Sequence, residues 1–409
     1  MLVLLSLKID KTAIFCYHDI VTKIESSGRF MNLVYNTFDS LSSSLSNFFL
    51  SFSPHISKPQ AKNLSYIILA SIDANSIITS SVASHFKGGL SYNKPESNER
   101  RIRRFLNNPH FDIYSFFDDL ISYVIDQYKV KHSDNIVFVC MDHSFNNDDF
   151  TTLTLTTRIG RQSIPIYFRC FEGTNDSHAF SFDTIKNALT FAHKLFPNYQ
   201  VIFLADRFFN DPSIFQLIED LSDFYCIRTK TNINVSIDSI SFVPLSSIKP
   251  YVYKSKLLEN IYFSFSKKHL VNIAISPSKD TDDPWYIVTN LPPKKALKYY
   301  SYRFGGIEFF FKSQKSNGFY LEKTTTRSLQ VFKNLFGITC ISILWLTILG
   351  VDYCKNKSHS KVNFYDVKII HGKPTRFKSF FRLGKEILSY AYNSCINIKI
   401  KTNFILYDV

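Results

Sequence analysis

Ile136-Val-Phe-Val-Cys-Met-Asp142 is an apolar run that ends in an aspartate, and a second run of this kind follows it, Val201-Ile-Phe-Leu-Ala-Asp206. Continuous apolar runs that are rich in β-branched and aromatic residues predict strands buried on both faces of a sheet. Ligands of such sheets bind outside the carboxyl ends of the strands. We therefore expect Asp142 and Asp206 to lie at the ends of their strands, at one ligand-binding edge.

The segments around these two runs predict the topology of the sheet. Residues 151–157 alternate with a period of two, and residues 163–170 form a further β-prone run, which predicts a meander of three antiparallel strands. A helix, the strand that ends at Asp206, another helix and a strand follow, over about 180–196, 201–206, 212–221 and 224–228. This is the element order of an RNase H-like α/β fold.

Residues 131–229 form the first part of the predicted RNase H-like domain. The rest of the chain divides into four further predicted parts. Residues 1–130 carry apolar residues at helical spacing and predict a helical N-terminal region. Residues 230–294 contain short β-prone pieces separated by prolines, which predicts a β-rich insertion. Residues 295–350 return to a helical pattern and complete the domain, while residues 351–409 form a basic tail without a predicted structure.

The composition indicates a globular protein that attracts polyanions. Of its 409 residues, 45% are hydrophobic, and 48 Lys and Arg against 34 Asp and Glu give a formal net charge of +14. Such a field favours nucleic acid or an anionic membrane as a partner. Because residues 336–350 are apolar over fewer than the roughly 20 residues that cross a bilayer, we expect a buried helix and no membrane partner.

The cysteines and the N-terminus indicate a cytoplasmic protein. Seven widely spaced cysteines without a Cys-x-x-Cys pair suggest neither a disulfide framework nor a structural zinc site. The apolar opening of the chain is interrupted early by Lys8 and is not expected to be a signal peptide.

The densest basic cluster lies in Glu99-Arg-Arg-Ile-Arg-Arg-Phe-Leu106, within the helical N-terminal region. Helical periodicity places Arg100, Arg103 and Arg104 on one face and turns Arg101 away from it. A solvated surface helix is one interpretation of this face. In so basic a chain we favour a helix that contacts DNA phosphates.

Three blocks of the sequence resemble the motifs of DDE transposases of the insertion-sequence-four type, which are bacterial cut-and-paste elements. The blocks are Met141-Asp142-His143-Ser144, Leu204-Ala-Asp206-Arg207-Phe-Phe209, and Tyr300-x-x-Arg303 followed by Glu308 and Lys315. They occur in the order of the family, with its long insertion between the second aspartate and the glutamate. The resemblance implies metal-dependent strand cleavage and strand transfer at transposon ends, by Asp142, Asp206 and Glu308.

The resemblance also implies DNA-binding residues around the glutamate. Tyr300, Arg303 and Lys315 match family positions thought to grip DNA near the transposon end, although four residues instead of three separate Arg303 from Glu308. In one helical stretch expected from about 294 to 315, Glu308, Lys312 and Lys315 share a face, so both lysines are expected to hold a phosphate. Arg207 either contacts phosphate or pairs with a carboxylate.

Three converging carboxylates predict divalent cations, because their mutual repulsion raises their pKa values unless cations fill the site. Oxygen ligands favour Mg²⁺, for which Mn²⁺ can substitute, and a two-ion site activates an attacking oxygen and stabilises the leaving oxygen. The rival carboxylates Asp148, Asp149 and Asp211 follow the predicted strand ends and are expected to lie in loops. For His143 a structural hydrogen bond is favoured over a role as general base.

The expected partners are double-stranded DNA, as terminal inverted repeats and target, and a second copy of the chain on that DNA, at the nucleoid. Two other functions stay open. One is an RNase H-like nuclease that cuts without joining. The other is a degenerate or domesticated DNA-binding protein without catalytic activity.

Overall fold

The computed structural model describes residues 29–90, 93–126, 135–159, 162–174, 176–277, 284–315, 318–355, 364, 366–370 and 373–393. The chain forms two compact units, which are treated separately here. One combines Met1–Tyr128 with Lys312–Leu406, and the other combines Lys129–Phe311 with Tyr407–Val409.

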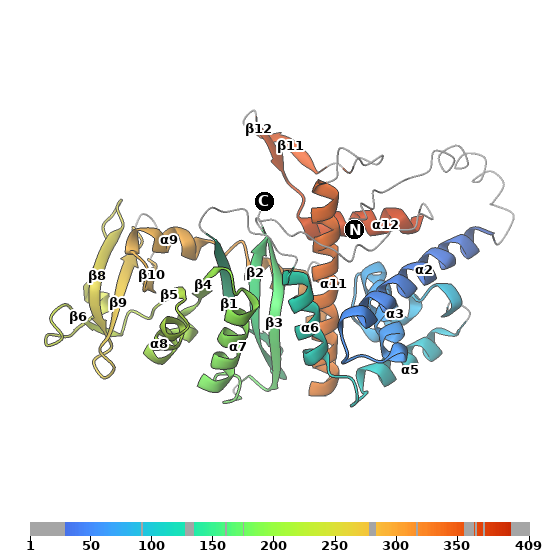
Figure 1. Cartoon of the computed structure of the whole chain (residues 1–409), viewed down its shortest axis with the longest axis horizontal. Helices are drawn as coiled ribbons and strands as arrows, with labels where there is room; N and C mark the ends of the chain where they lie inside the picture. Colours follow the sequence, from blue (N-terminus) through green and yellow to red (C-terminus); the bar gives the residue numbers. More distant parts are fainter. Residues whose placement is uncertain are drawn as a thin grey trace. The chain divides into compact units, whose positions relative to one another are not determined.

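The second unit is built on one mixed sheet that begins with the predicted meander. The strands β1 (Ile136–Asn146), β2 (Phe150–Ile159) and β3 (Gln162–Glu172) pair antiparallel, whereas β4 (Gln200–Ala205) and β5 (Phe224–Arg228) add to β1 in parallel. The resulting order β3-β2-β1-β4-β5 (Figure 1) confirms the prediction of an RNase H-like α/β fold.

The segment predicted as a β-rich insertion extends this same sheet beyond β5. Its strands are β6 (Asn234–Ser236), β7 (Val243–Pro244), β8 (Lys256–Phe263), β9 (His269–Ile275) and β10 (Tyr286–Thr289). In the described residues they continue the order as β5-β10-β9-β8-β6-β7, all antiparallel. Short turns and the 3₁₀ helix η3 (Leu245–Ser247) connect the outermost strands.

Helices cover both faces of the first five strands, and strand alternation decides which residues face which helices. On one face, Ile202, Leu204 and Cys226 share a core with Tyr300 and Ile307, from α9 (Pro293–Ser301) and α10 (Ile307–Lys315). On the other face lie α7 (Phe182–Leu195) and α8 (Pro212–Asp220), where Phe215 stacks on Tyr225 with ring centroids 4.8 Å apart.

The single helical stretch expected from about 294 to 315 is wrong, because the chain turns between Ser301 and Ile307. In this turn the amide of Arg303 donates to the carbonyl of Tyr300, and the amide of Gly306 donates to the carbonyl of Arg303. A Cβ at Gly306 would lie 2.8 Å from Ser163 Oγ and 3.2 Å from Cys140 Sγ. The absence of a side chain there lets the turn pack directly on β1 and β3.

The first unit is mainly helical, as predicted for the N-terminal region. In chain order its helices are α2 (Arg29–Phe52), α3 (Lys58–Ala74), α4 (Thr79–Ser84), η1 (Gly88–Leu90), α5 (Pro95–Leu106), α6 (Ile113–Asp126), η4 (Leu321–Lys323), α11 (Leu329–Lys355) and α12 (Phe380–Asn393). The strands β11 (Val367–Ile370) and β12 (Lys373–Arg376) form a hairpin between the last two helices. Structure therefore extends into the segment after residue 350, for which the sequence predicted none.

The helix α11 is longer than its apolar run predicted. We expected residues 336–350 to be too short to cross a bilayer, but the helix spans Leu329–Lys355 and, by length and mean hydropathy, passes as a candidate membrane span. Its most apolar window is 94% buried within the protein. Burial of this extent indicates the core helix of the first unit. The expectation of a buried helix therefore agrees with the structure, but because of the burial and not because of the length of the apolar run.

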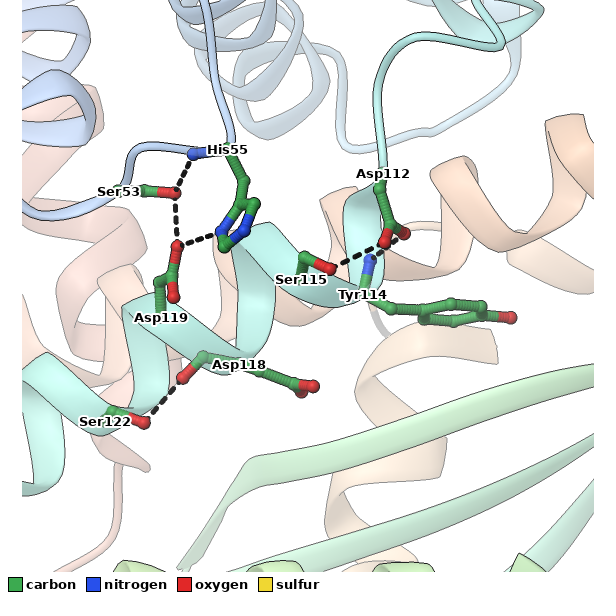
Figure 2. A network of polar contacts seen from close by, with 8 residues as sticks. All are labelled: Ser53, His55, Asp112, Tyr114, Ser115, Asp118, Asp119 and Ser122. Carbon is green, nitrogen blue, oxygen red and sulfur yellow. Dashed lines mark hydrogen bonds and ion pairs between the residues drawn. The ribbon is translucent and has the colours of Figure 1, made fainter.

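Polar contacts join the loop after α2 to α6 (Figure 2). Both Ser53 Oγ and His55 Nδ1 contact Asp119 Oδ2, at 2.5 and 2.8 Å. These are the residue types of a hydrolase triad, but here the serine and the histidine share one carboxylate oxygen instead of forming a chain. The network therefore links two elements and gives no activated nucleophile.

A candidate carboxylate site at the sheet edge

Asp142 and Asp206 lie side by side in the register of the sheet, on the face covered by α9 and α10. Met141 of β1 pairs with Ala205 of β4, and the parallel pairing of the two strands ends at that pair. Asp206 follows β4 directly and accepts a hydrogen bond from the amide of Arg207 at 2.6 Å. The two aspartates are thus adjacent, as the sequence indicated.

Asp142 does not end its strand, contrary to expectation. The strand β1 continues to Asn146, because after the parallel pairing stops it still pairs antiparallel with β2, where Asp142 lies opposite Thr154. The aspartate therefore marks the end of the β1–β4 pairing and not the end of β1. Its backbone is held on one side by the β2 ladder, which fixes the direction of its side chain.

Glu308 reaches the same site from the first turn of α10, and Arg303 contacts both Glu308 and Asp142. Arg303 Nη2 lies 2.6 Å from Asp142 Oδ2, and Arg303 Nη1 lies 3.5 Å from Glu308 Oε1. The arginine side chain is only 8% exposed, against 17% for Asp142 and 49% for Glu308. The turn between α9 and α10 thus directs Arg303 into the carboxylates despite the extra residue before Glu308.

The electrostatics of the site reflect three neighbouring carboxylates. Burial raises the pKa of Asp142 to about 6; the charges of Asp206 and Glu308 raise it as well, whereas Arg303 opposes them. Burial also raises the pKa of Glu308, with Arg303 opposing and Asp206 adding to the rise. The charge of Asp206 therefore acts on both Asp142 and Glu308, and Arg303 opposes the rise of both pKa values.

The carboxylates have the hard oxygen donors that Mg²⁺ and Mn²⁺ prefer. Among the described residues, however, no three His, Cys, Asp or Glu side chains come close enough together to hold a metal ion. The donor chemistry fits a divalent cation, while the guanidinium of Arg303 contacts the oxygens of two of the three expected ligands.

The other residues singled out around the site differ in exposure. Tyr300 is 1% exposed, packs edge-on against Trp285 with ring centroids 5.5 Å apart, and has a pKa raised to about 12 by burial. Its contact with DNA stays a prediction. His143 points to the opposite face of β1, where Nε2 lies 3.0 Å from the carbonyl oxygen of Ala179 and burial lowers its pKa to about 4.

The rival aspartates lie in loops. Asp148 and Asp149 are exposed in the β1–β2 turn. The Asp211 side chain accepts a hydrogen bond from the amide of Ser213 at 2.7 Å and caps α8. This is the local role that a short polar side chain commonly plays before a helix.

The residues expected to contact phosphates from α5 and α10 lie at solvent-accessible positions. On α5, Arg100, Arg103 and Arg104 are exposed, and Arg103 Nη2 pairs with Glu99 at 2.7 Å. Arg101 is turned away from them and donates to Asn63 Oδ1 at 2.7 Å. Lys312 and Lys315 lie in the last turn of α10, where Lys312 is exposed and Lys315 partly so.

A basic cavity beside Asp206 was missed from the sequence. It has a volume of about 160 Å³, and its described lining includes Arg207, Arg228 and Lys230 and no acidic side chain. Arg228 ends β5, the strand next to β4, so its position at the same edge as Asp206 follows from the strand order. The signal available was the cationic end of the predicted strand 224–228.

Comparison with known proteins gives a family match for part of the chain. Residues 183–345 match the family of the transposase DDE domain, a segment that includes Asp206, Arg303 and Glu308 but begins after Asp142. No curated protein matches the chain. A solved structure, described as the cryo-EM structure of a piggyBac transposase synaptic complex with hairpin DNA, resembles it with a TM-score of 0.48 and 10% identity, over 90% of this chain and 79% of that one. The family match, which spans less than half of the chain, supports a DDE-type transposase domain within it.

Proposed function

We propose that this protein is a cut-and-paste transposase of the insertion-sequence-four type, which cleaves and joins DNA strands at transposon ends. The observation that carries the proposal is that Asp142 lies next to Asp206 in the sheet register and that Arg303 contacts both Asp142 and Glu308. The negative charge of Asp206 also acts to raise the pKa of Asp142 and of Glu308. The match to the transposase DDE domain supports the same activity.

In the proposed mechanism Asp142, Asp206 and Glu308 would hold two divalent cations, Mg²⁺ or Mn²⁺. When bound, such ions activate an attacking water or 3′-hydroxyl and stabilise the leaving oxygen at phosphorus. Asp142 and Asp206 are fixed by the sheet register, while Glu308 is carried on a separate helix. This rigid placement of two ligands favours a preorganised site.

The proposed substrate is double-stranded DNA, bound through its phosphates. A DNA phosphate fits the basic cavity lined by Arg207, Arg228 and Lys230, because the cavity lies beside Asp206 and presents cations to an anionic backbone. Further phosphate contacts are assigned to the exposed face of α5 and to Lys312 and Lys315. The family implies terminal inverted repeats and a target duplex as substrates, and a homodimer on the DNA at the nucleoid.

The test is cleavage of a labelled duplex that carries the end sequence of the element, with Mg²⁺ or Mn²⁺. The wild-type protein is expected to release a 3′-hydroxyl end and to join it to a second duplex. Asp142→Asn, Asp206→Asn and Glu308→Gln are each expected to reduce both steps to background while DNA binding persists. Asp148→Asn, which removes an exposed carboxylate from the β1–β2 turn, serves as the matched control and is expected to cleave normally. Full cleavage by any of the three site variants would refute the assignment.

The non-catalytic DNA-binding protein is the second candidate, and the position of Arg303 favours it. An arginine that contacts two of the expected metal ligands is compatible with a site that binds no metal. The same assay separates the candidates. End binding without cleavage by the wild-type protein supports the non-catalytic reading, whereas cleavage without joining supports an RNase H-like nuclease.

A further inference from the structure

Arg303 lies where its charge faces two carboxylates at once. Its guanidinium contacts Asp142 through Nη2 at 2.6 Å and Glu308 through Nη1 at 3.5 Å. Arginine suits this position because its planar fork directs donors to separate acceptors in a fixed geometry, whereas a lysine ammonium is a single compact charge. The third donor, the buried Nε, has no hydrogen-bond partner among the described residues. The arginine thus uses its two terminal nitrogens on the carboxylates alone.

Arg303 places its positive charge directly against these carboxylates. Its side chain is 8% exposed and that of Asp142 is 17% exposed, so their contact at 2.6 Å is largely shielded from water. Little solvent therefore screens this ion pair, and the charge of Arg303 acts strongly on anything that binds at Asp142.

A divalent cation held by Asp142 and Glu308 would share its ligands with the guanidinium, which contacts Asp142 Oδ2 at 2.6 Å and Glu308 Oε1 at 3.5 Å. The arginine and the metal are both positive, so they repel each other across the shared carboxylates. Binding of one therefore disfavours the present position of the other.

We propose that Arg303 is an internal counter-ion that competes with divalent metal for Asp142 and Glu308, so that metal binding requires the guanidinium to withdraw. This inference rests on the proposed function, because it takes both carboxylates as metal ligands. The withdrawal is assigned to the side chain and not to the turn, because the turn packs closely against Cys140 and Ser163 at Gly306. Arg303 is thus a positioning residue for the two carboxylates.

The test is a titration of the purified full-length protein with Mn²⁺. Electron paramagnetic resonance measures the free Mn²⁺ at each step. Arg303→Gln is expected to bind Mn²⁺ at least about tenfold more tightly than wild type, because the competing charge has been removed. Mn²⁺ is also expected to raise the melting temperature of Arg303→Gln more than that of wild type. Neither readout depends on DNA cleavage.

A control separates competition from a general change of charge. Arg228→Gln removes the same charge from an arginine that, like Arg303, acts electrostatically on Tyr300. It is expected to change Mn²⁺ affinity much less than Arg303→Gln does. Arg303→Lys keeps the charge but lacks the planar fork, so it is expected to bind Mn²⁺ with intermediate affinity. This variant replaces Arg303→Gln in the test if Arg303→Gln does not fold.

The outcomes distinguish this inference from the proposed function. Equal or weaker Mn²⁺ binding by Arg303→Gln overturns the inference, as does an equal gain in Arg228→Gln, while metal-dependent cleavage by the wild-type protein would leave the proposed function standing. Tighter Mn²⁺ binding by Arg303→Gln supports the inference even if the wild-type protein cuts no DNA. In that case the proposed function is refuted and the inference stands. No Mn²⁺ binding by any variant overturns the inference.

Discussion

At the scale of single residues, Asp112 shows how one side chain defines the start of a helix. It precedes α6, accepts a hydrogen bond from the amide of Tyr114 at 3.0 Å and another from Ser115 Oγ at 2.6 Å (Figure 2). Burial acts to raise its pKa, but these hydrogen bonds outweigh burial and leave the pKa below the usual 3.8. The ionised carboxylate is therefore the form that stabilises the helix.

Asp112→Ala is expected to lower the free energy of unfolding by about 1 kcal/mol at pH 7, the usual cost of losing a cap. Because the pKa is lower in the folded state, the carboxylate contributes stability above pH 3.8 and loses it as the pH falls through the folded-state pKa. The difference between variant and wild type, measured by urea denaturation at pH 7, 5 and 3, should thus shrink at pH 3. Asp126→Ala, at the other end of α6, is the control and should cost nothing. A pH-independent difference would contradict this account.

At the scale of elements, α11 and α12 approach so closely that glycine is required at their contact. A Cβ on Gly384 would lie 1.9 Å from the carbonyl oxygen of Leu346, and one on Gly350 would lie 2.1 Å from the carbonyl oxygen of Phe380. These contacts are with backbone atoms, which cannot turn aside as a flexible side chain can. The two helices must therefore separate to accept any side chain at either position.

Gly384→Ala is expected to destabilise the protein by about 3 kcal/mol, the upper end of what overpacking costs, even though alanine is the better helix former. The comparison is Ser389→Ala on the exposed face of α12, which should be neutral or slightly stabilising. Thermal unfolding of both variants provides the measurement. A Gly384→Ala protein as stable as wild type would show that the helices are not in backbone contact.

Local patterns predicted the elements well and their ends less well. The apolar run that ends at Asp142 correctly predicts a buried strand, but β1 continues through polar residues to Asn146 because β2 pairs with them. Similarly, the apolar run at 336–350 predicts only the middle of α11. In β1, pairing with β2 extends the strand into residues whose own pattern carries no strand signal, whereas in α11 the helical pattern of residues 295–350 reaches beyond the apolar run.

The carboxylate site was predictable only in part, for a related reason. The strand order places Asp142 beside Asp206, and that order follows from the sequence of predicted strands and helices. The contact of Arg303 with Asp142 joins residues 161 positions apart and depends on a five-residue turn that the sequence suggested only as a helix. No local pattern specifies such a contact.

At the scale of the whole molecule, the net charge of +14 predicts DNA binding that depends strongly on salt. Such binding releases counterions in proportion to the number of phosphates contacted, so the slope of log K against log salt counts those contacts. The exposed arginines of α5 and the lysines of α10 are the proposed contributors. Charge spread uniformly over the protein would attract DNA in a similar way. A variant is needed to separate specific phosphate contacts from this general attraction.

Lys315→Ala is expected to weaken DNA binding and to reduce the salt slope by about one, the loss of one phosphate contact. Lys378→Ala removes the same charge from a lysine that lies outside the expected DNA-binding residues and serves as the control. Fluorescence anisotropy of a labelled duplex over a range of salt concentrations measures both slopes. If the two variants lower the slope equally, the overall charge attracts DNA and Lys315 makes no contact of its own, because a direct phosphate contact is lost only with the side chain that makes it.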